Sequence, residues 1–456
     1  MYKNDLYKIK YLKFTKDRRP CYCQYRNKSR CTTIGQEESK FMGKTIIEKI
    51  ISTHSGKKDV KPGDIVDVSV DRLMINDSNG PTVFKDFYLL GVNEVKNPEG
   101  ILIAMDHRVP PWDSKHADAI NFCRTFAREH KLNGFRDIGR NGIGHQMMCE
   151  CFVRPGEIAV GTDSHSTMYG GMGALGCGVN SADAAVIMAT GTMWMKVPES
   201  ILITLKGRPK KGVTAKDIAL QLQTVAPPEI FIYKAVEIAG EYAHEMSVSS
   251  RLVIANMICE TGAKCGIIPG DDVAAAYLNE DICHLTSDPD AVYSEQYEIN
   301  LDEMEPVLAF PHAVNNVKPI SEASGIRIQQ AFLGSCTNGR IEDFMQAAEI
   351  LRGRKVHPEV RLLVVPGSQQ VFLEMTRLGL TELFTECGAA VMNSSCASCG
   401  GFGPGTIGSG EVCISTTNRN WKGRMGPASS SVYLGSAYAV AAAAVSGEIV
   451  SPLVYL

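Results

Sequence analysis

The sequence predicts an α/β fold built on parallel β-sheets, and two observations support this. First, apolar strand-like segments alternate with amphipathic helical segments between residues 326 and 415, with short connections between them. This alternation is typical of parallel sheets. Second, apolar segments in both halves end beside cysteine, histidine, aspartate or asparagine, residues that a parallel sheet gathers at one edge. The 456 residues, 44% hydrophobic and 21% charged, suggest two to four globular domains.

The predicted elements follow in order along the chain. The segment 41–56 opens the first helix, and "GILIAMDHRVP" (100–110) and "EIAVGTDSHST" (157–167) are interpreted as strands. Acidic residues in a first turn and Gly353 near a last turn mark a later helix. In the carboxyl-terminal half, the predicted strands are 326–335, 360–368, 389–395 and 411–420, and the predicted helices are 341–353 and 369–379.

Cysteine and polar residues follow the ends of these four strands. In an open parallel sheet, ligands collect just beyond the carboxyl ends of the strands. The residues predicted to share this edge are Cys336, Ser368, Cys396, Cys399, Asn418 and Arg419. The further partner of the Cys396–Cys399 pair is therefore expected to be Cys336.

The amino-terminal half delivers histidines and carboxylates in the same way. Two histidines follow predicted strands, each with an aspartate within two residues, and a third follows a glycine-rich turn. The residues concerned are Asp106, His107, His145, Asp163, Ser164 and His165. Each histidine taken alone is explained as a core residue beside a capping aspartate. The three together favour a functional site.

The segment "NSSCASCGGFGPG" (393–405) admits several chemistries. A redox pair needs a helix that starts inside the Cys-x-x-Cys and lowers a thiol pKa, but the glycines after Cys399 oppose a helix. Structural zinc wants four protein ligands, and a second Cys-x-x-Cys is missing. Three cysteines around a glycine-rich cradle suit an iron–sulfur cluster with one iron open to substrate. The spacing alone leaves all three interpretations open.

Composition and charge narrow the class of protein. Fifteen cysteines without a signal peptide favour a reduced, cytoplasmic chain over a secreted disulfide scaffold. No apolar run reaches the length of a membrane-spanning helix, and the net charge of −3 points to neither nucleic acid nor membrane. Residues 1–41 hold 11 of the 47 Lys+Arg but four of the 50 Asp+Glu. We interpret them as a basic extension, disordered or from a wrongly assigned start, in preference to a presequence or a basic arm.

Six motifs occur together, in the order "MDHRVP", "GTDSHST", "NMICETGAKCG", "LGSCTNGRIEDF", "CASCGGFGPG" and "STTNRNWKGRMG". With them the chain from about Met42 onward resembles the aconitase superfamily, and most closely its 3-isopropylmalate dehydratase large subunits. The resemblance implies a three-domain α/β/α core with parallel-type sheets around a central cluster cleft. Domains 1 and 2 would be intertwined in residues 42–290. Domain 3, with the cluster cysteines and a C-terminal return helix, would span 291–456.

The resemblance also implies roles for the motif residues. The metal ligands would be Cys336, Cys396 and Cys399, holding one 4Fe–4S cluster whose labile fourth iron binds substrate. His107 would protonate the leaving hydroxyl, and Asp106 would orient the His107 ring. The catalytic set would be Asp106, His107, His145 with Asp163, and His165 with Glu260; the substrate-binding set Asn76, Ser164, Arg419 and Arg424; and the cluster environment Asn256, Asn338 and Asn418.

Two departures from the family pattern bear on partner and substrate. Asn76 stands where relatives have glutamine or histidine, so the substrate stays open. The swivelling fourth domain is missing, so we expect a separate small subunit to supply the catalytic serine base. The implied function is a hydro-lyase that dehydrates or isomerises a 2-hydroxy di- or tricarboxylic acid. The first candidate converts 2-isopropylmalate to 3-isopropylmalate in leucine biosynthesis, and the alternatives are homoaconitase and a dimethylmalate- or citramalate-type dehydratase.

Two functions of other classes fit the sequence less well. A cluster-free RNA-binding regulator wants a basic cleft and the fourth domain, whereas the chain after residue 41 holds 36 basic and 46 acidic residues. A one-electron carrier wants a fourth cysteine beside the trio; Cys387 and Cys413 are nearest in sequence, and Cys413 falls inside a predicted strand. We therefore expect a small-molecule substrate and neither nucleic acid nor membrane.

Overall fold

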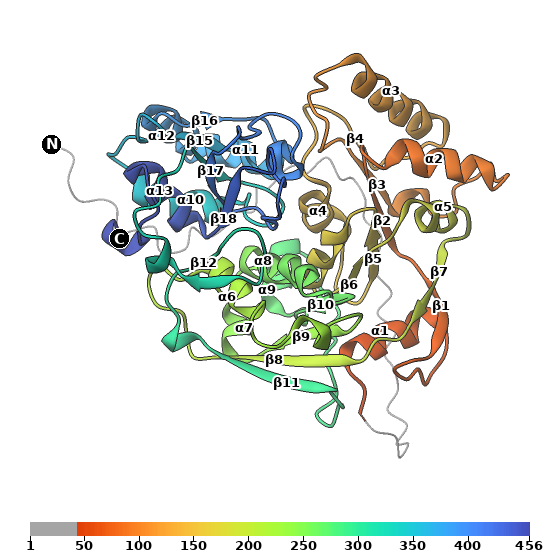
Figure 1. The fold of residues 1–456 in the computed structure, drawn as a ribbon. Helices are drawn as coiled ribbons and strands as arrows, with labels where there is room; N and C mark the ends of the chain where they lie inside the picture. The colour runs from red at the N-terminus through yellow and green to blue at the C-terminus, as the bar shows by residue number, and fades with distance from the viewer. Residues whose placement is uncertain (1–42) are drawn as a thin grey trace. The chain divides into compact units, whose positions relative to one another are not determined.

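The computed structural model describes residues 43–456, so the predictions for residues 1–41 lie outside the described part of the chain. Two parallel sheets and one mostly parallel sheet, with helices packed beside them, confirm the predicted α/β class (Figure 1). The division into domains at residue 290 stays a prediction. Within residues 43–456, no helix is both long enough and apolar enough to cross a membrane.

The first sheet has five parallel strands in the order β4-β3-β2-β5-β6. Its central strands are short apolar runs buried on both faces, as expected for a parallel sheet with helices beside it. Helix α2 packs against both α3 and α5. The strands are β2 (Arg72–Asn76), β3 (Ile101–Ala104), β4 (Phe135–Arg136), β5 (Ile158–Gly161) and β6 (Leu175–Gly178); the helices are α2 (Gly80–Leu89), α3 (Ser114–Glu129), α4 (Gly144–Met147) and α5 (Ser181–Thr190).

The second sheet has four parallel strands in the order β10-β9-β8-β11. Helix α8 is buried along most of its length, between α6 on one side and a 3₁₀ segment, Ser164–Met172, on the other. The strands are β8 (Ser200–Lys206), β9 (Ala235–Ala239), β10 (Cys265–Ile267) and β11 (Glu295–Asn300); the helices are α6 (Ala215–Leu222), α7 (Glu241–Glu245), α8 (Val248–Ile258) and α9 (Asp272–Leu278).

The third sheet has seven strands in the order β13-β12-β18-β17-β14-β15-β16. The four predicted strands correspond to β14, β15, β16 and β17 and are parallel, as predicted; β18, which was not predicted, is parallel to β17, whereas β12 pairs with both neighbours in antiparallel fashion. The strands are β12 (Val307–Ala309), β13 (Val317–Pro319), β14 (Gln330–Leu333), β15 (Arg361–Val364), β16 (Ala390–Val391), β17 (Val412–Ser415) and β18 (Ser431–Leu434); the helices are α10 (Ile341–Leu351), α11 (Gln369–Arg377), α12 (Leu380–Cys387) and α13 (Ala437–Ser446).

Two elements complete the described fold. Helix α1 (Ile46–Ser55) begins at Thr45, whose hydroxyl and the Glu48 carboxylate form a capping box, and it ends at Gly56. An antiparallel pair, β1 (Ile65–Ser69) with β7 (Thr192–Lys196), lies apart from the three larger sheets. The predicted first helix, 41–56, is therefore confirmed over most of its length.

Hydrogen bonds join the carboxyl edges of the first and third sheets. The backbone N–H of Cys396, beyond β16, donates to the carbonyl of Asp106, beyond β3, at 2.8 Å. The buried amide of Asn141 donates to the carbonyls of Met105 (3.0 Å) and Ser394 (2.9 Å). The two sheet edges at which the sequence placed its candidate residues are therefore held against each other.

A buried ion pair fixes helix α8. Arg251 is fully buried, and its guanidinium donates to both carboxylate oxygens of Asp271 at 2.7 Å each. It also donates to the carbonyls of Met246 and His244, both at 3.1 Å. Burial would raise the pKa of Asp271, but the contacts with Arg251 lower it. Arg251 thus links α8 to the start of α9.

Replacing Arg251 with methionine should lower the free energy of unfolding by about 3 kcal/mol, because Asp271 loses the cation that compensates its partial burial. Urea unfolding of the two proteins measures the difference. The exposed pair Lys206–Glu298 is the control, and Lys206→Met should change stability by less than about 1 kcal/mol. Equal small effects of both substitutions would contradict this account of α8.

Candidate active site

The three candidate cysteines lie at the carboxyl edge of the seven-stranded sheet. Cys336 follows β14, and Cys396 and Cys399 lie on one loop after β16. Gly334 is required before Cys336, because its φ is 157° and an added Cβ would lie 2.5 Å from a backbone carbonyl oxygen. Ala397 has φ 45°, a left-handed turn that places both loop cysteines at one edge.

Amide and guanidinium groups surround the sulfur atoms. Asn256 and Asn418 each donate a side-chain N–H to the Cys336 sulfur at 3.3 Å. The Cys399 sulfur lies 3.8 Å from the carbonyl oxygen of Asn418 and 3.8 Å from a guanidinium nitrogen of Arg424. The predicted cluster-environment residues Asn256 and Asn418 therefore contact a candidate ligand directly.

All three cysteines are free thiols, and the surroundings of two of them oppose ionisation. Burial, together with the neighbouring Cys399, raises the pKa of Cys336 to about 12. Burial likewise holds the pKa of Cys396 well above its usual value, and His107 opposes this shift. A thiolate set at this edge therefore requires a compensating positive charge.

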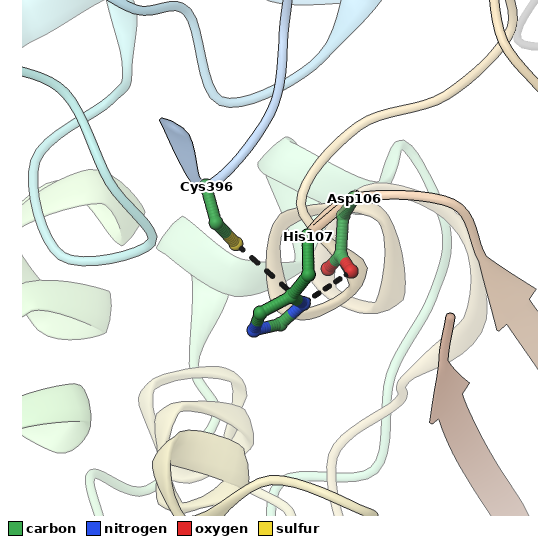
Figure 2. Close-up of side chains that lie close together, drawn as sticks. All are labelled: Asp106, His107 and Cys396. Atoms are coloured by element: carbon green, nitrogen blue, oxygen red, sulfur yellow. Dashed lines mark hydrogen bonds and ion pairs between the residues drawn. The ribbon is translucent and has the colours of Figure 1, made fainter. Parts of the chain in front are cut away.

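The acid pair predicted from the sequence, Asp106 with His107, lies beside Cys396 (Figure 2). His107 Nδ1 lies 2.6 Å from an Asp106 carboxylate oxygen and 3.9 Å from the Cys396 sulfur. The other Asp106 oxygen accepts the backbone N–H of Gly144 at 2.7 Å. Burial would lower the pKa of His107, but Cys396 and Asp106 hold it well above its usual value.

Asp77 is a member of the site that the sequence analysis missed. It follows β2 and is 1% exposed, and its two carboxylate oxygens accept the backbone N–H groups of His107 (3.1 Å) and Arg108 (2.8 Å). Burial, with the nearby Asp106, raises the pKa of Asp77 to about 6. Its place directly after a parallel strand is the signal that could have identified it.

The remaining predicted acid–base residues form one continuous chain. His145 Nε2 lies 3.0 Å from an Asp163 carboxylate oxygen, and His165 Nδ1 lies 3.1 Å from the same oxygen. His165 Nε2 lies 2.8 Å from Glu260 Oε1. His145 is held on its other side by the hydroxyl of Tyr169 at 3.1 Å. The two predicted pairs, His145 with Asp163 and His165 with Glu260, are thus joined through Asp163.

These contacts shift the pKa values in opposite directions. Burial would raise the pKa of Asp163, but hydrogen bonds from His145 and His165 hold it well below its usual value. Burial would lower the pKa of His165, but Asp163 and Glu260 raise it. Burial would raise the pKa of Glu260, but His165 and Arg419 lower it. The pair His165–Glu260 therefore favours imidazolium beside carboxylate.

Arg419 completes this chain at the carboxyl end of β17. Its Nε lies 2.8 Å from a Glu260 oxygen, and a terminal nitrogen donates to the Ser164 hydroxyl at 2.9 Å. The guanidinium also lies over the ring of Trp421, 4.8 Å from the ring centroid. Ser164 and Arg419, both predicted to bind substrate, are therefore in contact with each other.

Two predicted residues have other local contacts. Asn76 is buried, and its side-chain carbonyl accepts the backbone N–H of Asn79 at 2.9 Å, which forms the turn before α2. Asn338 donates to Asp343 in the first turn of α10 at 2.7 Å. Their substrate and cluster roles stay predictions.

Two groups of possible metal ligands in residues 43–456 have ligand atoms within 4.8 Å of one another. They are Asp106 with His107 and Cys396, and His165 with Cys259 and Glu260. Neither contains more than one of the three cysteines, so the trio is too widely spaced to hold a single ion. In the second group, the guanidinium of Arg419 already lies against Glu260 and 3.7 Å from the Cys259 sulfur.

The fold and this site define an α/β protein with a thiol-lined polar centre, and comparison with known proteins identifies its family. The model of the aconitase family (aconitate hydratase) matches residues 48–447. The chain belongs to the aconitase family.

Similar relatives are 3-isopropylmalate dehydratase large subunits. That of Moorella thermoacetica is 42% identical over 416 residues, which cover 90% of this chain and 99% of that protein. That of a Hydrogenobaculum species is 43% identical over 416 residues, 90% of this chain and 98% of that protein. Among solved structures, Thermococcus kodakaraensis aconitase X in its holo-form has a TM-score of 0.49 and 9% identity, covering 82% of this chain and 89% of that one.

The family implies an iron–sulfur cluster, and the residues of this chain fit one. Four buried side-chain atoms without a hydrogen-bond partner adjoin the cysteines; they are Ser394 Oγ, Ser398 Oγ, Asn338 Oδ1 and Arg424 Nε. Orphaned buried polar atoms are rare in folded proteins and are expected where a group binds. The three free thiols, which are too widely spaced to hold one ion, also fit a group that contains several irons.

Replacing Glu260 with glutamine should destabilise the metal-free protein most at mildly acidic pH. Glu260 has a lowered pKa, so its contribution is present above its ordinary pKa of 4.5 and is lost as pH falls through the folded value. His165 has a raised pKa, so its contribution is present below its ordinary pKa of 6.5 and is lost as pH rises through the folded value. The loss should peak between those values, at about 3 kcal/mol.

Urea unfolding of wild type and variant at a series of pH values measures this profile. Glu411→Gln is the matched control, because Glu411 also has a lowered pKa and pairs with Arg361, which does not titrate in this range. The control difference should therefore show no decline on the alkaline side. A Glu260→Gln difference that is flat across the series would refute the Glu260–His165 pairing.

Proposed function

We propose that this chain is the iron–sulfur subunit of a hydro-lyase that acts on a 2-hydroxy di- or tricarboxylic acid. One observation carries the proposal. Three free thiols, an imidazole held above its usual pKa and two arginines meet where the carboxyl edges of the first and third sheets are joined. The relatives named 3-isopropylmalate dehydratase large subunit make 2-isopropylmalate the first substrate to test.

Cys336, Cys396 and Cys399 would hold one 4Fe–4S cluster. When bound, such a cluster supplies an iron with open positions, a Lewis acid toward a hydroxyl and a carboxylate. The chain's part is to present deprotonated sulfur atoms. Amide donors from Asn256 and Asn418 support negative charge on Cys336, and the Arg424 guanidinium does the same for Cys399.

His107 is the proposed acid for the departing hydroxyl. Asp106 engages Nδ1 of the ring, which leaves Nε2 as the nitrogen that delivers a proton. The raised pKa, which Cys396 and Asp106 cause, favours the protonated form of His107. The backbone hydrogen bonds from His107 and Arg108 to Asp77 fix the loop that carries the ring. When the C–O bond breaks, the Nε2 proton would leave with the oxygen as water.

The chain His145–Asp163–His165–Glu260 is proposed to keep the adjoining wall of the site charged and ordered. Each imidazole is held by a carboxylate, so its protonation and ring orientation are fixed. Arg419 is held by Glu260 and Ser164, and its guanidinium is proposed to bind a substrate carboxylate together with that of Arg424.

A second polypeptide is proposed to supply the base that removes the carbon-bound proton. Relatives at 41 to 43% identity are named large subunits, a name that implies a small subunit. We propose that this partner carries the swivelling domain and its serine. The free thiols of the described residues also favour a reducing compartment such as the cytoplasm.

The direct test is a substrate panel. The chain is loaded with iron and sulfide under anaerobic conditions and mixed with a 3-isopropylmalate dehydratase small subunit. Formation of the unsaturated acid is then followed by ultraviolet absorbance. We expect turnover of 2-isopropylmalate, and turnover only of homocitrate, citramalate or dimethylmalate would redirect the assignment within the class. Iron uptake without turnover of any hydroxy acid would refute the hydro-lyase.

The cysteine variants supply the control for this experiment. Cys336→Ser should lose the visible absorbance of the cluster and at least about 90% of the turnover, because a ligand is removed. Cys387→Ser removes a buried thiol away from the trio and should load as wild type does. Full iron content in Cys336→Ser would exclude Cys336 as a ligand.

Replacing Arg419 with lysine should raise the KM for the hydroxy acid about tenfold or more, because lysine cannot form a two-point contact with a carboxylate. Steady-state kinetics of the loaded complex measures KM and kcat separately. Arg72→Lys, which alters a similar two-point pair with Glu157 in another part of the chain, is the control. An unchanged KM for Arg419→Lys would exclude Arg419 from substrate binding.

A further inference from the structure

One buried lysine has no place in the mechanism above. Lys216 lies in the first turn of α6 and is fully buried. Its ammonium donates to the backbone carbonyls of Thr416 (3.0 Å) and Thr417 (2.7 Å), and the Met257 sulfur lies 3.8 Å away. All three partners are neutral groups.

A buried ammonium is costly unless anionic groups compensate its charge. The groups that act electrostatically on Lys216 are Cys336, Asp343, Cys399 and Asp217. The two carboxylates have partners of their own: Asp343 accepts from Asn338 and Arg340, and Asp217 accepts from Thr214 and Val307. The remaining two groups that act on Lys216 are Cys336 and Cys399, which are candidate cluster ligands.

The position of the carbonyls that Lys216 binds is also informative. Thr416 and Thr417 follow the end of β17 and directly precede Asn418, which contacts the Cys336 and Cys399 sulfur atoms. Arg419 comes next in the chain. Lys216 therefore anchors the segment that carries the Asn418 amide and the Arg419 guanidinium into the site.

We propose that Lys216 is the buried counter-ion of the cluster ligands Cys336 and Cys399 and the anchor of the segment that carries Asn418. This inference rests on the proposed function, because it requires the cysteines to be thiolates bound to iron. It assigns Lys216 a positioning and electrostatic role, without contact with substrate.

The effect of the Lys216 charge is expected to differ between the iron-loaded and the metal-free protein. Without iron, the hydrogen-bond partners of the buried ammonium are the neutral carbonyls of Thr416 and Thr417, which leave its desolvation cost only partly compensated. With iron bound, the ligand set is anionic, and the fixed positive charge lowers its energy. Burial lowers the pKa of Lys216 to about 7, against the opposing effect of Cys336 and the other nearby acidic groups. The stabilisation therefore operates only in the loaded state.

The experiment compares Lys216→Met with wild type, each metal-free and anaerobically loaded. The control is Lys264→Met, because Lys264 is also largely buried and lies beside a thiol, Cys177, that is not in the trio. We expect Lys216→Met to lose iron to a chelator about tenfold or more faster than wild type. Its cluster should have a lower reduction potential, since a nearby positive charge is gone. Its metal-free Tm should change no more than that of the control.

A second variant separates charge from hydrogen bonding. Lys216→Gln keeps a donor for the carbonyls of Thr416 and Thr417 and guards against a variant that does not fold. It should lose iron as fast as Lys216→Met. Wild-type iron retention and reduction potential in the glutamine variant would overturn the counter-ion role while leaving the proposed function intact. Failure of wild type itself to take up iron would overturn both.

Discussion

The thiols of Cys336, Cys396 and Cys399 lie close enough to interact electrostatically, and no disulfide joins them. Burial raises the pKa of at least two of these thiols. Ionising them in this environment requires positive charge from outside the thiol set. The surroundings are built accordingly. Amide donors reach Cys336, a guanidinium reaches Cys399, an imidazole lies beside Cys396, and the buried ammonium of Lys216 acts electrostatically on Cys336 and Cys399. The proposed cluster would supply the remaining positive charge.

The acid–base groups follow from the same arrangement. Joining the carboxyl edges of two parallel sheets places the His107 ring between a carboxylate and a thiol. The more distant histidines are held by carboxylates in a chain that ends at Arg419. The histidines of this site are therefore each paired with a carboxylate, which is how a protein tolerates charged groups in a buried site.

Much of the fold and of the site could be predicted from the sequence, because the end of a strand indicates both the strand and the site residue that follows it. An apolar run followed by Asp106 or Cys336 marks a strand and a candidate site residue at once. Strands β12 and β13 gave no comparable signal, because three residues are too few to show a period. The position of Asp77 directly after β2 marks it as a candidate, but its role depends on backbone N–H groups 30 and 31 residues away. Side-chain patterns in one sequence do not encode such contacts.

The central claim is that Cys336, Cys396 and Cys399 together ligate one iron–sulfur cluster. Anomalous X-ray diffraction at the iron edge, from crystals of the anaerobically loaded chain, tests it most directly. The account predicts one iron peak large enough for several irons, within bonding distance of all three sulfur atoms and of no fourth cysteine. A single-ion peak, a peak at other residues, or a disulfide between any two of the three would contradict it.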